Sequence, residues 1–122
     1  MSLMHDIQDG NLTAFAKSST SANTPVTSGF IDLSEVGGIE EAHYVVEVPT
    51  ASKALTIAIV GDNAEDGEFS TTVATWTTTA ATAFEPVRER IPLNAPRYWK
   101  LRVTTGAQVP ATAVTAKLTV RV

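Results

Sequence analysis

The chain has 122 residues, no cysteine and a formal net charge of −4 at pH 7. This length suits one domain with a hydrophobic core of its own. The lack of cysteine excludes a disulfide framework, a thiolate nucleophile and a cysteine-ligated metal cluster, and the short apolar runs fall far below the ~20 residues that a membrane-spanning helix needs.

The N-terminus begins Met1-Ser2-Leu3 before a second methionine, Met4, which is typical of an expression scar. We therefore expect one domain over residues 4–122 and no division into two. Because no basic start followed by an apolar stretch occurs, we expect no signal peptide, and intracellular assembly.

Four residue types, Thr, Ala, Val and Ser, supply 56 of the 122 residues. Thr and Val favour strands, since a branched β-carbon packs well on a pleated surface and is restricted in a helix. Alanine does not recur with Leu, Glu and Lys at helical spacing. The composition therefore predicts an all-β domain.

In the first half of the chain, alternation of apolar and polar residues predicts strands over 30–34 and 42–48, and a short strand is possible over 12–17. The Ser- and Thr-rich residues 18–28 are expected to form a mobile arm or a long loop. Residues 53–60 are apolar on both faces, which predicts a strand that is central or covered on each side.

In the second half, residues 69–77 and 86–91 are weaker strand candidates. Pro86 and Pro92 confine the latter to an edge of the sheet, or are themselves confined to its ends, because proline has no N–H to donate to a neighbouring strand.

The last two predicted strands have the clearest alternation. Within 97–104, Trp99, Leu101 and Val103 share one face, and residues 114–122 alternate over nine positions. Gly, Pro, Asn and Asp separate the strands at intervals of roughly 8–12 residues. About eight short strands at that spacing predict a single antiparallel β-sandwich or jelly roll.

Groups that carry catalysis are scarce. The chain has two histidines, His5 beside the presumed scar and His43 within a predicted strand. It has no Gly-x-Ser-x-Gly elbow, Gly-rich phosphate loop, dinucleotide fingerprint or paired-His metal motif. We therefore predict no catalytic residues, no cofactor and no metal site, and place His43 on a solvent-facing side of its strand.

One acidic segment, residues 61–68, has the kind of oxygen ligands that calcium prefers. Its spacing departs from a calcium loop, since Ala64 occupies a ligand position and no bidentate Glu closes it. The other interpretation is a solvated hairpin connection in which Gly67 accepts a positive φ. The sequence leaves calcium binding open.

Basic residues and aromatic rings raise two further possibilities. Tyr98 and Trp99 lie among the basic residues of the second half, as in a groove for single-stranded nucleic acid. However, the alternation turns Trp99 toward the core, and a pI of about 5 disfavours phosphate, so we expect no nucleic acid partner. Trp76, among threonines, is the best candidate for a sugar-stacking ring, but a core or interface position is favoured.

Charge is divided unequally along the chain, with a balance of −9 over residues 1–68 and +5 over residues 69–122. Complementary patches steer association between proteins, so the division suits binding to other copies or to a large protein partner. Alternatively, acidic and basic strands are neighbours in one sheet and neutralise each other.

The order of these segments resembles the jelly-roll capsid cement, or head-decoration, proteins of tailed bacteriophages. The resemblance covers about residues 4–122 and rests on strand and loop order, with these segments: Phe30-Ile31-Asp32-Leu33, Gly37-Gly38, Tyr44-Val45-Val46-Glu47-Val48, Leu55-Thr56-Ile57-Ala58-Ile59, Glu68-Phe69-Ser70 and Arg97-Tyr98-Trp99-Lys100-Leu101-Arg102-Val103.

The resemblance implies a structural virion protein, assembled as a homotrimer, that binds the capsid exterior and clamps neighbouring major capsid proteins after assembly in the host cytoplasm. Weak contacts from three copies would add up to stable attachment. From charge and strand parity we predict contacts, within a trimer or with the capsid, between a basic and an acidic set: Arg88, Arg90, Lys100 and Arg102 against Glu65, Asp66 and Glu68.

Two other classes remain open. A carbohydrate-binding β-sandwich of a phage or bacterial surface protein predicts Trp76 exposed in a cleft. An enzyme, which we do not expect, predicts a concave pocket that gathers His43 with carboxylates.

Overall fold

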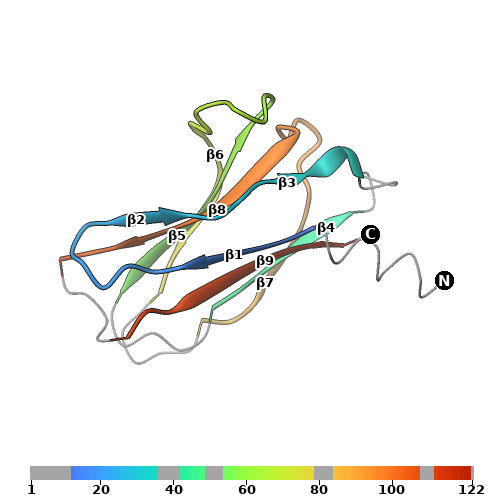
Figure 1. The fold of residues 1–122 in the computed structure, drawn as a ribbon. Coiled ribbons are helices and arrows are strands. Elements are labelled where there is room, and N and C mark those ends of the chain that lie inside the picture. Colours follow the sequence, from blue (N-terminus) through green and yellow to red (C-terminus); the bar gives the residue numbers. More distant parts are fainter. Residues whose placement is uncertain (1–11, 36–41, 49–53, 79–83, 108–111, 122) are drawn as a thin grey trace.

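The computed structural model describes residues 12–35, 42–48, 54–78, 84–107 and 112–121. In these ranges the chain forms two antiparallel sheets that pack face to face, so the predicted all-β sandwich is confirmed (Figure 1). None of the helical structure in these ranges is long and apolar enough to cross a membrane.

Within the described ranges nine strands make up the two sheets, and a 3₁₀ turn, η1 (Leu33–Glu35), follows the third strand. Sheet A contains, in spatial order, β1 (Thr13–Lys17), β9 (Thr115–Arg121), β4 (His43–Glu47) and β7 (Val87–Arg90). Sheet B contains, in spatial order, β2 (Pro25–Thr27), β8 (Tyr98–Thr105), β5 (Leu55–Asp62) and β6 (Thr71–Thr77), and β3 (Ile31–Asp32) also pairs with β8.

The strand pairing identifies the sandwich as a jelly roll. β1 pairs with β9, β2 and β3 with β8, β4 with β7, and β5 with β6. The chain is thus one long antiparallel hairpin, with β5 and β6 at its tip, wound so that successive pairs lie in alternate sheets. With β2 and β3 counted as one interrupted strand, this gives the eight strands of a jelly roll.

The core lies between the sheets and follows the predicted alternation. Trp99, Leu101 and Val103 of β8 are fully buried, as is Leu118 of β9. The ring of Tyr44 from sheet A meets Trp99 edge to face, with 5.5 Å between ring centroids, which joins the two layers. Burial of these large apolar side chains is the main favourable contribution to folding.

The structure confirms most predicted strands and corrects two segments. Of the strand predicted over residues 30–34, only Ile31–Asp32 pairs with β8, and Leu33–Glu35 form the 3₁₀ turn η1. β5 is central, between β8 and β6, and β7 is an edge strand, as its flanking prolines indicated. Residues 18–28 were expected to be an arm or loop, but residues 25–27 form β2, because their backbone pairs with β8. The predicted scar at residues 1–3 and the Gly37-Gly38 turn lie outside the described residues.

Candidate interaction surface

The outer face of sheet A combines basic side chains with an exposed aromatic ring. Register and strand alternation place its members on the side away from the core. We call this surface the sheet A face and define it by Phe15, Lys17, His43, Val45, Glu47, Arg88, Arg90, Thr115, Lys117 and Thr119.

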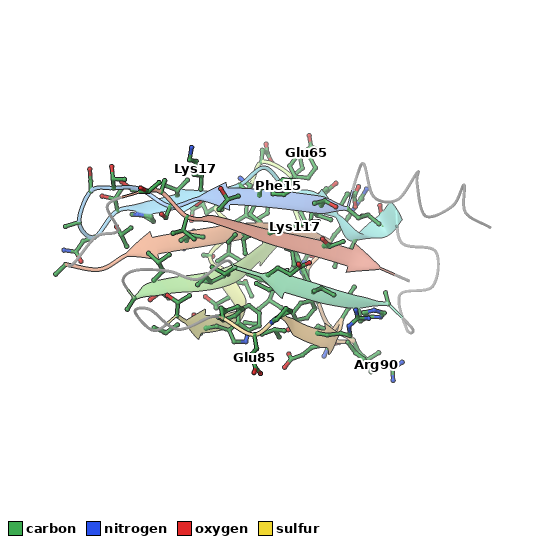
Figure 2. The ribbon with its side chains drawn as sticks, turned by 90° about the horizontal axis from the view of Figure 1, so that it is seen from below. Phe15, Lys17, Glu65, Glu85, Arg90 and Lys117 are labelled. Carbon is green, nitrogen blue, oxygen red and sulfur yellow. The ribbon has the colours of Figure 1, made fainter. Side chains whose placement is uncertain are left out.

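Phe15 of β1 is the most conspicuous member of the sheet A face. Its side chain is 58% exposed, although neighbouring Ala14 and Ala16 are buried on the core side. Lys117 lies opposite on β9, with its Nζ 5.9 Å from the centroid of the Phe15 ring. Figure 2 shows the two side chains beside each other on this face, with Lys17 further along β1.

A shallow hollow adjoins Phe15 and crosses the strands. The register aligns Phe15, Lys117 and Glu47 across β1, β9 and β4. The hollow, of about 430 Å³, is lined by Phe15, Glu47, Val48, Pro86, Thr115 and Lys117. It is open to solvent and offers both an apolar wall and charged groups.

The other end of the sheet A face is also basic. Arg88 lies on β7 opposite Val45, and its Nη1 donates to Nε2 of His43 at 3.1 Å. Arg90 lies opposite His43. The defined members therefore include four Lys and Arg side chains against Glu47, a positive surface on a chain whose net charge is negative.

The outer face of sheet B is organised differently, because it has a small apolar cluster of its own. Val60, Phe69 and Tyr98 are buried there, and Phe30, which is 42% exposed, packs edge to face on Tyr98. Lys100 covers this cluster, with its Nζ 4.2 Å from the centroid of the Phe69 ring. Lys100 thus contributes to local packing.

The acidic segment forms the connection between β5 and β6, as the hairpin interpretation predicted. The Asp62 carboxylate accepts hydrogen bonds from the backbone N–H groups of Ala64 (2.9 Å) and Phe69 (3.2 Å), which lower its pKa. This bonding directs the Asp62 oxygens to the backbone. Among the described residues, no three or more acidic or histidine side chains form a group that fits a metal ion.

The expected positive φ at Gly67 is wrong. No described glycine has a positive φ, and Phe69 has it instead, at 53°. Glycine is required at position 67 for another reason, since a Cβ there would overlap the Asp62 carboxylate. The strained Phe69 backbone turns its ring into the cluster on sheet B.

An ion pair links β3 to the residue that precedes β8. The Arg97 guanidinium donates from Nε (3.0 Å) and Nη2 (3.1 Å) to the two carboxylate oxygens of Asp32. This bidentate contact holds the pKa of Asp32 at about 2, below its ordinary value of 3.8. It also raises the pKa of Arg97. Arg97 also lies over the ring of Tyr98, 4.9 Å from its centroid.

The seven predicted contact residues do not form one surface. Arg88 and Arg90 lie on the sheet A face, on β7. Lys100 and Arg102 point outward from β8 on the opposite sheet. The three acidic residues, Glu65, Asp66 and Glu68, are exposed in the β5–β6 connection, near the sheet B side.

Phe15, Lys17 and Lys117, which form the β1–β9 part of the sheet A face, were not predicted as contact residues from the sequence. The sequence pattern contained part of this information. In the possible strand over residues 12–17, the buried Leu12, Ala14 and Ala16 alternate with Phe15 and Lys17. An apolar outward residue such as Phe15 stands out only once that register is fixed by pairing with β9.

His43 and Trp76, the residues considered for catalysis and for carbohydrate binding, both contact other side chains of the fold. His43 is partly exposed and bonds to Arg88, as expected for an outward strand position. Trp76, the ring that the carbohydrate alternative requires exposed, is partly buried and packs on the core, with its centroid 6.2 Å from that of Tyr44. The Tyr44 hydroxyl donates to Glu89 at 2.7 Å, and burial with this carboxylate raises its pKa.

Comparison with protein-family models, with curated proteins and with solved structures finds no match for this chain.

Proposed function

We propose that this protein is a structural component of a bacteriophage virion, which binds the outside of the capsid shell and stabilises it. The observation that carries the proposal is the 58% exposure of Phe15 on the basic face of sheet A, on edge strand β1. Aromatic side chains of this kind are the usual anchors of protein interfaces.

The chemistry of the sheet A face supports a protein partner. Phe15 would lose its remaining water contact when covered, and burial of apolar area is favourable by about 25 cal/mol per Å². Lys17 and Lys117 flank the ring and would face carboxylates or carbonyl oxygens of the shell. Such charges direct docking and fix its orientation more than they add affinity.

The hollow beside Phe15 extends this surface toward β4 and β7, where Glu47 supplies a carboxylate and Pro86 an apolar edge. Of the seven contact residues predicted from sequence, the proposal assigns Arg88 and Arg90 to the shell. It leaves out Lys100, which packs on Phe69.

Self-association is part of the proposal, because a domain of 12.9 kDa gains stable attachment when several copies bind together. The sequence resemblance implies three copies. The proposed location is the exterior of the virion, with the major capsid protein as the partner.

The proposal is tested by cosedimentation with shells assembled from the major capsid protein encoded with this chain. We expect saturable binding of the wild-type protein and at least tenfold weaker binding of Phe15→Ser, since aromatic anchors that become buried in an interface commonly contribute about 2 kcal/mol or more. Phe30→Ser is the matched control, because Phe30 is also an exposed aromatic residue (42%) but lies against Tyr98 on the outer face of sheet B.

Shell binding by Phe30→Ser should equal that of the wild type. Failure of the wild-type protein to bind shells would contradict the proposed function. If Phe15→Ser bound shells as tightly as the wild type, the proposed function would stand, but the sheet A face would not be the surface that binds the shell.

A further inference from the structure

Among the described residues, the two sheet paths end at β1, β7, β2 and β6, and the composition of the first three protects them against pairing with another chain. β7 has four residues, three of them charged, between two prolines. β2 has three residues and begins with Pro25, and β1 ends in Lys17. Short length, charge and proline are the usual means by which proteins block such pairing.

β6 is the exception. It spans seven residues, Thr71–Thr77, without a charged residue or a proline. Its one irregularity is a β-bulge at Val73, where the register with β5 shifts, and residues 74–77 pair regularly beyond it. It pairs with β5 on one side, and no strand of the described chain pairs with its other side. Every residue of β6 is exposed or half-buried, whereas most of its neighbour β5 is buried. Within the described chain, the outer backbone N–H and C=O groups of β6 thus have no strand partner, which is what an added strand requires.

The core is incompletely covered beside this edge. β1 packs near β2 and β8, which places β6 and β7 together on the other side of the sandwich. Four apolar residues pack against the core there and are only partly buried: Val73 and Trp76 of β6, and Phe84 and Val87 at and before β7. By contrast, Trp99 of β8 is fully buried. A strand added to β6 would extend sheet B over this open seam.

The charges on the edge strands indicate which strand can pair with β6. An extended strand that pairs with β6 should be uncharged and should turn alternate apolar side chains toward the seam. β6 itself meets both conditions, with Trp76 directed to the core and Thr75 exposed on the outer face. A β6–β6 contact opposes no like charges, whereas a β7–β7 contact would bring Arg88 and Arg90 of both copies together.

We propose that β6 of one copy pairs in antiparallel fashion with β6 of a second copy about a two-fold axis. The two five-stranded sheets become one continuous sheet, and the contact is closed because each copy contributes the same strand. The inference rests on the self-association included in the proposed function. It gives a dimer in place of the trimer that the sequence resemblance implies.

Light scattering coupled to size exclusion on the full chain tests the pairing. We expect the wild-type protein to have twice the 12.9 kDa mass of one copy. Thr75→Lys places two like charges close to the axis and should give the mass of one copy. The matched control, Thr56→Lys, changes an exposed residue of the same sheet on central β5 and should remain a dimer.

A wild-type monomer or trimer, or a Thr75→Lys protein that remains a dimer, would overturn the pairing. If Thr75→Lys does not fold, amide hydrogen exchange of the wild-type protein decides the question. Protection of residues 71–77 that rises with protein concentration supports the pairing, and protection independent of concentration refutes it. Absence of shell binding by an intact dimer would count against the proposed function alone.

Discussion

At the scale of the residue, the core depends on side chains that alternate with solvent-facing neighbours on one strand. Leu118 of β9 is fully buried between the sheets, and Thr115, three positions earlier, is exposed on the sheet A face. β9 lies between β1 and β4, so the surroundings of Leu118 have little room to collapse. Truncation of the Leu118 side chain should therefore leave a cavity.

We expect Leu118→Ala to lower the free energy of unfolding by about 2–5 kcal/mol, because apolar contacts are lost and a cavity remains. Thr115→Ala, the control on the same strand, should change it by no more than about 0.5 kcal/mol. Urea denaturation monitored by tryptophan fluorescence measures both. Similar losses in the two variants would be inconsistent with the described register of β9.

The Asp32–Arg97 pair predicts a dependence of stability on pH. The pKa of Asp32 is held at about 2 in the folded protein, below its ordinary value of 3.8. A depressed carboxyl pKa contributes stability that is present above pH 3.8 and is lost as the pH falls through 2. In Asp32→Asn this contribution is absent, so the wild-type advantage should shrink between pH 4 and pH 2.

Urea midpoints of wild type and Asp32→Asn across that range measure the difference. A wild-type advantage that stays constant from pH 5 to pH 2 would show that the ion pair does not stabilise the fold.

At the scale of the element, the β5–β6 connection is held by one carboxylate. Asp62 bonds to the backbone of Ala64 and Phe69, and Gly67 leaves the space that its oxygens occupy. This arrangement buries Phe69 against sheet B. The conformation of an exposed acidic connection is thereby tied to the packing of an apolar ring.

We expect Gly67→Ala to lower the Tm, because the new Cβ displaces the Asp62 carboxylate from its hydrogen bonds. Gly29→Ala is the control, since a Cβ there meets no atom within 4 Å and the φ is not positive. That substitution should be neutral or slightly stabilising. Thermal unfolding of the two variants measures the effect, and an unchanged Tm in Gly67→Ala would contradict this account of the connection.

The elements were predictable where alternation extended over several residues. Strands β4, β8 and β9 follow from it directly, and the edge position of β7 follows from Pro86 and Pro92. β2 could not be predicted, because it has three residues and begins with a proline. Its strand conformation depends on pairing with β8, which is distant in sequence.

At the scale of the whole molecule, the charge division along the chain is not a division between faces. The winding of the jelly roll places Lys17 of β1 with Lys117 of β9, although they come from opposite halves of the chain. It also places the acidic β5–β6 connection on the sheet B side, where Lys100 lies. The sheet A face could therefore be predicted only after strand order was known.

The proposed function requires that the sheet A face, and not the outer face of sheet B, meets the capsid shell. Acetylation of lysines in the free and shell-bound protein, quantified by mass spectrometry, tests it most directly, because both faces carry lysines. We expect shells to protect Lys17 and Lys117 while Lys100 keeps the reactivity that it has in the free protein. Protection of Lys100 without protection of Lys17 and Lys117 would contradict the account.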